Sequence, residues 1–224
     1  MMKVAIDGPA GAGKSTIARA AASRLGYVYI DTGAMYRAVA LFAVRRGIST
    51  KNDVAGVIGV LPEISITIRH VDGVQRIFLG GEDVSEAIRM PEISVAASEV
   101  AVIPEVRQKL VQLQRQLSET ADVIMDGRDI GTYVLPDAEV KIFLTADVTV
   151  RAERRYKELC EKGTETTLDE VLRDMQYRDA NDSGRAFAPL RQAEDAVAVD
   201  TTLLTAEESI DHVIAVIRGA CNVV

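Results

Sequence analysis

The hydrophobic positions of the chain form five short apolar runs that alternate with longer stretches of helical periodicity. The runs comprise residues 4–6, 27–30, 123–125, 140–144 and 196–199. Short, predominantly apolar runs of this length are typical of buried parallel strands, and parallel strands need helical crossovers between them. The pattern therefore predicts an α/β fold in which helices flank a five-stranded parallel sheet.

Capping signals delimit three of the predicted helices. Thr205 with Glu208 forms a capping box before the last helix, whose apolar residues recur at helical spacing. Thr167 with Glu170 forms a second box, which opens a helix that we expect to end near Asp179. The helix before it is expected to begin at Asp147 and to end at Gly163.

The helix over residues 105–117 is predicted from its apolar stripe alone. Val106, Leu110, Leu113 and Leu117 recur on one face of this helix. Arg107 is expected to lie beside the stripe rather than on it.

One segment interrupts the α/β rhythm. Residues 64–68 alternate apolar and polar up to Asp72-Gly73, a strong hairpin turn, and a second apolar run passes through Ile77 and Leu79. An antiparallel hairpin has no natural place in a sheet built from crossovers. We therefore predict a small inserted subdomain over about residues 62–104.

A glycine-rich stretch follows the first apolar run. It reads VAIDGPAGAGKST from Val4 to Thr16, with the spacing Gly8, four residues, Gly13, Lys14, Ser15. This is the phosphate-binding loop (P-loop): glycines turn backbone N–H groups toward phosphate, the lysine reaches the β- and γ-phosphates, and the hydroxyl ligates Mg²⁺. The predicted ATP-binding residues are Gly8, Pro9, Ala10, Gly11, Ala12, Gly13, Lys14, Ser15 and Thr16.

Composition restricts the kind of ligand. The 224 residues carry a formal net charge of −7, which argues against a duplex nucleic-acid binder and favours a small anion held by a few local arginines. The two cysteines make no disulfide framework, and no apolar run reaches the roughly 18 residues of a membrane span. We expect a cytoplasmic monomer without a signal peptide, without a nucleic-acid partner and without a membrane partner.

The class must come from motifs other than the P-loop. A GTPase would need an Asn-Lys-x-Asp base reader, and Lys51–Asp53 does not supply one. A small kinase needs a second anion site made of arginines. Three arginine-containing motifs are present: DTGAMYR at residues 31–37, DGRDIGT at 126–132 and YRDANDSGR at 177–185.

With the P-loop and the inserted hairpin, these motifs make almost the whole chain resemble the bacterial cytidylate kinase family of nucleoside monophosphate kinases. The resemblance implies phosphoryl transfer from ATP to CMP or dCMP, with Mg²⁺, on a five-stranded core with a mobile lid. It places the core at about 1–35, 105–148 and 186–224, the nucleoside-monophosphate subdomain at about 36–104 and the lid at about 149–185.

The resemblance also assigns roles to individual residues. Thr32, Arg37, Arg128 and Arg185 match the positions that hold the CMP phosphate. Ser98, Arg107 and Asp129 match those that read the cytosine edge. Arg178 and Asp182 match those that bind the ribose hydroxyls.

The remaining roles concern the metal and the lid. Asp126 ends an apolar run, where a carboxylate is expected beside the P-loop Mg²⁺, directly or through water. Arg151, Arg154 and Arg155 would lie on the lid, and either Arg154 or Arg155 is expected to act catalytically together with Lys14 and Arg128.

Two other readings of the sequence stay open at this point. The acceptor could be another small molecule, such as UMP or dTMP. The chain could also be a P-loop module that binds nucleotide without chemistry.

Overall fold

The computed structural model describes residues 1–71, 74–161 and 163–221. The chain divides into two compact units. The first unit comprises Met1–Tyr29 and Ser118–Val224, and the second comprises Ile30–Leu117. The predicted hairpin turn at Asp72-Gly73 lies outside the described residues.

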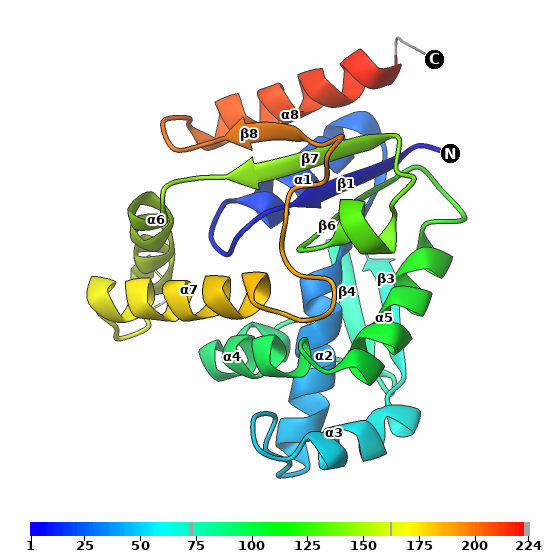
Figure 1. Cartoon of the computed structure of the whole chain (residues 1–224), viewed down its shortest axis with the longest axis vertical. Helices are drawn as coiled ribbons and strands as arrows, with labels where there is room; N and C mark the ends of the chain where they lie inside the picture. The colour runs from blue at the N-terminus through cyan, green and yellow to red at the C-terminus, as the bar shows by residue number, and fades with distance from the viewer. Residues whose placement is uncertain (72–73, 162, 222–224) are drawn as a thin grey trace. The chain divides into compact units, whose positions relative to one another are not determined.

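A five-stranded parallel sheet is present, as predicted. Its strands are β1 (Lys3–Asp7), β2 (Val28–Asp31), β6 (Val123–Gly127), β7 (Val140–Thr145) and β8 (Val197–Asp200). Their order is β2-β6-β1-β7-β8, so β1 is the middle strand (Figure 1). Four of these strands belong to the first unit, and β2 spans the boundary at which the second unit begins. The predicted apolar runs supply the buried residues of β1, β6 and β7. In open sheets of this kind, ligands bind at the carboxyl ends of the central strands.

Helices α1 (Lys14–Leu25) and α8 (Ala206–Cys221) pack on each other and on this sheet (Figure 1). Both predicted capping boxes are present. Thr205 and Glu208 exchange hydrogen bonds before α8. Thr167 and Glu170 do the same before α7 (Leu168–Ser183).

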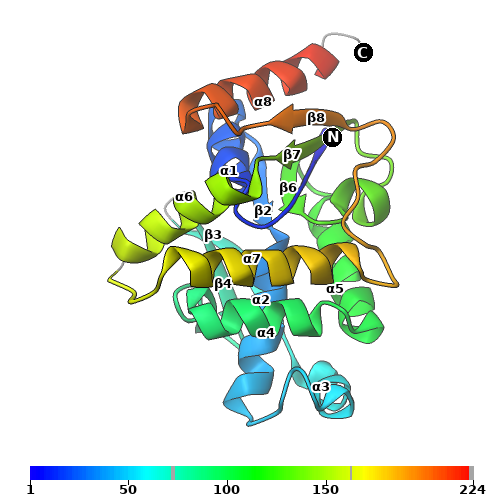
Figure 2. The ribbon, with the colours of Figure 1, turned by 60° about the vertical axis from the view of Figure 1, so that its left-hand side comes forward.

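Helices α6 (Val148–Glu161) and α7 pack together through Ala152, Val171 and Met175 (Figure 2). As predicted, the Asp147 carboxylate caps α6 by accepting from the N–H groups of Thr149 and Val150. The prediction that the next helix ends near Asp179 is wrong, because α7 continues to Ser183. No proline or glycine interrupts residues 180–183, so nothing in the chain stops the helix there.

The second unit has its own apolar core. Its helices are α2 (Thr32–Arg45), α3 (Val54–Val60), α4 (Pro91–Val100) and α5 (Pro104–Leu117). The predicted hairpin is formed by β3 (Ile66–Val71) and β4 (Val74–Leu79), and a short third strand, β5 (Glu82–Asp83), extends it. Short helical turns, η1 (Leu61–Glu63) and η2 (Ala87–Arg89), join these elements, and η3 (Ile130–Val134) follows β6 in the first unit.

The buried face of α5 differs from the predicted one. Its buried residues are Val106, Arg107, Leu110, Val111 and Gln114, whereas Leu113 and Leu117 are half-buried. Arg107 has no exposed surface at all. The predicted face of α5 was wrong because two polar side chains, Arg107 and Gln114, are part of the buried face.

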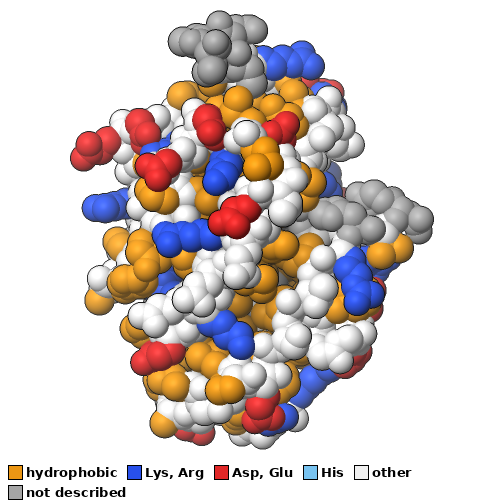
Figure 3. Space-filling view, turned by 90° about the vertical axis from the view of Figure 1, so that its right-hand side faces the viewer, with side chains coloured by type: hydrophobic (Ala, Val, Ile, Leu, Met, Phe, Trp, Pro, Cys, Tyr) orange, Lys and Arg blue, Asp and Glu red, His pale blue; other side chains and the backbone are white. Residues whose placement is uncertain are grey.

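Surface features are consistent with the composition. On the face shown in Figure 3, Lys and Arg side chains are interspersed with acidic and uncharged ones. Cys160 is exposed and forms no disulfide. Among the residues that the structure describes, no helix has both the length and the apolarity to cross a membrane.

Candidate active site

The P-loop joins β1 to α1 and has the backbone that its glycines were expected to permit. Gly8, Gly11 and Gly13 have φ values of 150°, 72° and 85°. At Gly8 an added Cβ would lie 1.9 Å from the carbonyl oxygen of Leu144, so no side chain fits there. No side chain caps α1 at Gly13, which leaves the first N–H groups of the helix directed at the loop, where they can bind an anion.

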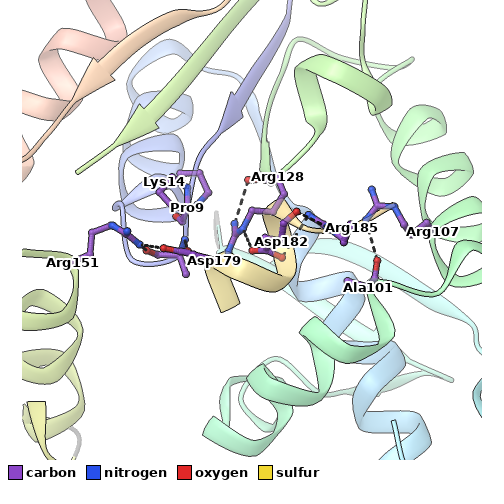
Figure 4. Close-up of polar contacts among 11 residues, drawn as sticks. Pro9, Lys14, Ala101, Arg107, Arg128, Arg151, Asp179, Asp182 and Arg185 are labelled. Atoms are coloured by element: carbon purple, nitrogen blue, oxygen red, sulfur yellow. Dashed lines mark hydrogen bonds and ion pairs between the residues drawn. The ribbon is translucent and has the colours of Figure 1, made fainter. Parts of the chain in front are cut away.

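Lys14 is the buried cation of this loop. Its Nζ donates to the carbonyl oxygen of Pro9 at 2.6 Å (Figure 4). Burial and the positive charge of Arg128 lower the pKa of Lys14, against the opposite effect of Asp126, Asp182 and Asp7. Arg128 therefore lies close enough to Lys14 to affect its pKa electrostatically.

Two oxygen donors converge beside the P-loop. The Ser15 hydroxyl donates to Asp126 Oδ2 at 2.8 Å, and the Tyr29 hydroxyl donates to Asp126 Oδ1 at 2.9 Å. Asp126 is almost fully buried near the end of β6. The two side chains predicted as metal ligands thus lie together within the first unit.

Arg128 and Arg185 both bind Asp182 (Figure 4). Arg128 Nε donates to Asp182 Oδ2 at 2.6 Å, and Arg185 Nη2 lies 3.6 Å from Asp182 Oδ1. Burial raises the pKa of Asp182, but the charges of Arg128 and Arg185 outweigh burial, so the pKa lies below its ordinary value. Two of the three predicted phosphate-binding arginines are therefore held by Asp182, which the resemblance assigned to the ribose.

Asp129 is the buried residue that links β6 to η3. The next two N–H groups, those of Ile130 and Gly131, each donate to one oxygen of Asp7 at 2.8 Å. Burial raises the pKa of Asp7 to about 7, and the Asp129 carboxylate adds to that rise. No role was predicted for Asp7 from the sequence.

The three arginines that the resemblance assigned to a lid, called the lid arginines below, have different environments. Arg151 is buried and donates through Nη1 to the Ala10 carbonyl and to Asp179 Oδ2, both at 2.7 Å (Figure 4). Arg154 instead donates to the backbone oxygen of Thr201. Arg155 pairs with Glu158 on its own helix. Arg151 is thus the lid arginine that contacts the P-loop.

Two further contacts attach α7 to the P-loop (Figure 2). The Ala10 N–H donates to Asp179 Oδ1 at 3.2 Å. A Cβ added at Gly11 would lie 2.5 Å from Met175 Cε, so the methionine packs against bare backbone. Asp179 was also missed, although it lies inside the YRDANDSGR motif.

The second unit carries four of the predicted substrate residues. Thr32 is buried at the start of α2, where Asp31 caps the helix by accepting from the Ala34 N–H at 2.9 Å. Arg37 follows on the same helix, and its Nη1 would lie 3.3 Å from a Cβ added at Gly33.

Ser98 and Arg107 lie near the corner between α4 and α5. Ser98 is buried in the last turn of α4. Arg107 Nη1 donates to the Ala101 carbonyl at the end of that helix, and its guanidinium lies 5.7 Å from the centre of the Tyr36 ring. The carbonyl and the aromatic ring together orient the buried guanidinium.

A parallel sheet with a central P-loop strand, and a cluster of arginines beside the P-loop lysine, define a kinase of the P-loop class. The structure aligns with a gluconokinase from Sinorhizobium meliloti at a TM-score of 0.52, with 15% sequence identity, over 99% of this chain and 95% of the other. At that identity the likeness concerns the fold.

Sequence comparison identifies the family within this class. The model of the cytidylate kinase family matches residues 4–219. A cytidylate kinase of Caldicellulosiruptor bescii is 53% identical over 95% of this chain and 94% of its own length. One of Desulfitobacterium hafniense is 52% identical over 96% of this chain and 91% of its own. The chain belongs to the cytidylate kinase family.

Proposed function

We propose that this protein transfers the γ-phosphoryl group of ATP to CMP or dCMP, which yields ADP and CDP or dCDP. The observation that carries the proposal is that a second cation, Arg128, lies near the P-loop cation Lys14 in the first unit and is held there by Asp182. Phosphoryl transfer between two anionic nucleotides requires two cationic sites, because the donor and acceptor phosphates repel each other. A module that only binds nucleotide needs one such site. Family membership supports the same assignment.

The reaction is a direct in-line displacement. An oxygen of the acceptor phosphate forms a bond to the γ-phosphorus while the bond from that phosphorus to the β-bridging oxygen breaks. The acceptor oxygen is already anionic, so no general base has to remove a proton. The mechanism therefore needs no histidine as a base. His212 is exposed on α8, outside all of the motifs named above.

Lys14 and the P-loop amides stabilise negative charge on the donor phosphates. Arg128 and Arg185 orient the acceptor phosphate, since a guanidinium offers a planar fork to phosphate oxygens. Among the lid arginines we assign the donor phosphates to Arg151, because it contacts the P-loop at Ala10. Thr32 and Arg37 keep the acceptor-phosphate role that the sequence predicts for them.

Mg²⁺ fits the oxygen donors beside the P-loop. Ser15 Oγ and Asp126 Oδ2 already lie 2.8 Å apart, and a hydroxyl and a carboxylate are the hard ligands that this ion prefers. Among the described residues, no cluster of three or more His, Cys, Asp or Glu could hold a metal ion; Mg²⁺ keeps several waters and is bound in such sites through one or two carboxylates together with substrate phosphates. When bound, Mg²⁺ would neutralise charge on the donor phosphates.

Base selectivity is assigned to Ser98, Arg107 and Asp129. Cytosine has a donor at N4 and an acceptor at N3, whereas uracil reverses both. A carboxylate at Asp129 can accept from N4, and Arg107 can donate to N3 or O2. Uracil in the same pose would leave polar groups unpaired, at about 1–3 kcal/mol each, so we expect CMP to be preferred about a hundredfold or more.

The experiment is a panel of acceptors with ATP and Mg²⁺. ADP release is measured with CMP, dCMP, UMP, dTMP or no acceptor, on the wild type and on Asp129→Ala. We expect release to depend on CMP or dCMP, and Asp129→Ala to lose mainly CMP activity. Release that is equal without acceptor would exclude the kinase assignment. Equal losses on CMP and UMP would make Asp129 a scaffold residue instead of a base reader.

A further inference from the structure

Asp7 is a buried carboxylate that the mechanism above does not use. It ends β1 and directly precedes Gly8, the first glycine of the P-loop. Only 4% of its surface is exposed. Its Oδ1 accepts from the Ile130 N–H and its Oδ2 from the Gly131 N–H, both at 2.8 Å. One side chain therefore binds two consecutive backbone amides that follow it by more than 120 residues.

These two amides begin η3, the turn of helix after β6. The first N–H groups of a helix have no acceptor within the helix and need one from outside. On the other side of the turn, strand pairing ends at Gly127, whose partner on β1 is Asp7 itself. Asp7 therefore holds this segment at both ends: its backbone pairs with Gly127, and its carboxylate binds the amides of Ile130 and Gly131. Arg128 and Asp129 are the two residues in between.

The β1 end of this arrangement is rigid. Gly8 touches the Leu144 carbonyl so closely that no Cβ could be added. β1 is also paired on both edges, with β6 and with β7. These contacts fix the backbone of Asp7 beside the P-loop, so its carboxylate starts from a fixed point when it binds the two amides.

A helix cap alone does not require this side chain. Ser, Thr and Asn cap helices about as well as Asp, and a buried carboxyl is costly, as the rise of the Asp7 pKa to about 7 shows. What a carboxylate offers is two acceptor oxygens that bind two amides at once. The geometry uses both oxygens, which fixes the direction of the backbone as well as its position.

We propose that Asp7 is a positioning residue for the acceptor: by holding the amides of Ile130 and Gly131 it sets the backbone from which Arg128 and Asp129 reach the phosphate and the base of CMP. The proposal rests on the acceptor roles given to Arg128 and Asp129 above. If the proposal holds, selectivity for the base of the acceptor depends on Asp7, a residue that precedes the P-loop and acts on the base only through Asp129.

Two variants test the proposal. Asp7→Asn keeps the shape but turns an NH₂ group toward one of the two amides. Asp7→Ser keeps one acceptor and removes the buried charge, so we expect this variant to fold at least as readily as the first. The matched control is Val213→Ala, a fully buried residue of α8 in the core of the same unit. This change destabilises the unit without touching η3.

Steady-state kinetics are measured with CMP and UMP at saturating ATP, and with ATP at saturating CMP. For both Asp7 variants we expect kcat/KM for CMP to fall about tenfold or more, the CMP to UMP ratio to fall at least about fivefold, and KM for ATP to stay within about twofold, in line with the loss of one well-made hydrogen bond. Val213→Ala is expected to leave the ratio unchanged at a comparable loss of thermal stability.

Two results would overturn the proposal. One is an unchanged CMP to UMP ratio in Asp7→Ser, and the other is an equal rise in the KM values for ATP and CMP, as a purely structural role would give. Failure of the proposed function itself is recognised separately, because wild-type protein would then release no ADP in response to CMP.

Discussion

Removal of the Asp182 carboxylate should strongly destabilise the protein even without substrates. The carboxylate lies 2.6 Å from Arg128 Nε and 3.6 Å from Arg185 Nη2, and its side chain is only 8% exposed. Deleting one partner of a buried ion pair costs about 3–5 kcal/mol, because the other charge stays buried. The Arg128 side chain is 21% exposed, so we expect the lower end, about 3 kcal/mol, for Asp182→Ala.

The assay is thermal and urea unfolding followed by circular dichroism. For a chain of this size, about 3 kcal/mol corresponds to a fall in Tm of roughly 6–12 °C. Asp182→Asn, which keeps an oxygen for Arg128 Nε, should lose less. The control is Asp195→Asn, because Asp195 pairs with Lys141 at a similar 2.7 Å but has a side chain that is 64% exposed. Screening by water makes such a pair weak.

The pH dependence gives the sharper test. The pKa of Asp182 lies below its ordinary value of 3.8 in the folded protein, so the ionised carboxylate contributes stability above the pKa of the unfolded chain. That stability is lost as the pH falls through the folded pKa. The difference in unfolding free energy between wild type and Asp182→Ala should be full at pH 7 and shrink at pH 3. A constant difference, or no difference at pH 7, would refute the ion-pair account.

Other predictions concern turnover. Lys14→Met should leave the circular dichroism spectrum unchanged and lower kcat about a hundredfold or more, since it removes the buried cation while the amide cradle survives; near-normal turnover would remove Lys14 from the mechanism. Arg151→Ala should lower kcat more than Arg154→Ala or Arg155→Ala, because only Arg151 of these three contacts the P-loop; the reverse order would favour the lid arginines predicted from the sequence. Arg178→Ala should change the CMP to dCMP ratio of kcat/KM if Arg178 binds the ribose, and an unchanged ratio would contradict that role.

The sheet could be predicted because its signal is local. Buried parallel strands are rich in apolar residues, and all five apolar runs proved to be strands of the parallel sheet, although β8 is buried only at Val199. Helix starts were equally readable, since a capping box lies within four residues. The predicted face of α5 was wrong because its signal is not local. Arg107 is buried through contacts with Ala101 and Tyr36, which the periodicity of α5 does not reveal.

The site divides in the same way. The conformation of the P-loop could be predicted because one segment contains its whole motif, and its glycines have the expected positive φ values. Asp7 and Asp179 were missed because their partners lie 123 and 169 residues away in the sequence. Each lies within or beside a motif that was recognised, but only the fold shows that their carboxylates bind backbone amides of another motif.

The acids of α7 also explain how a chain with a net charge of −7 can serve two polyanionic nucleotides. Burial and the positive charge of Arg128 both lower the pKa of Lys14. Asp182 holds Arg128 and Arg185, and Asp179, one turn earlier on the same helix, holds Arg151. These arginines are thus held in place before any nucleotide binds. Each carboxylate also competes with phosphate for the same guanidinium groups, so we expect phosphate to bind less tightly than it would to unpaired arginines, which favours release of the two diphosphate products.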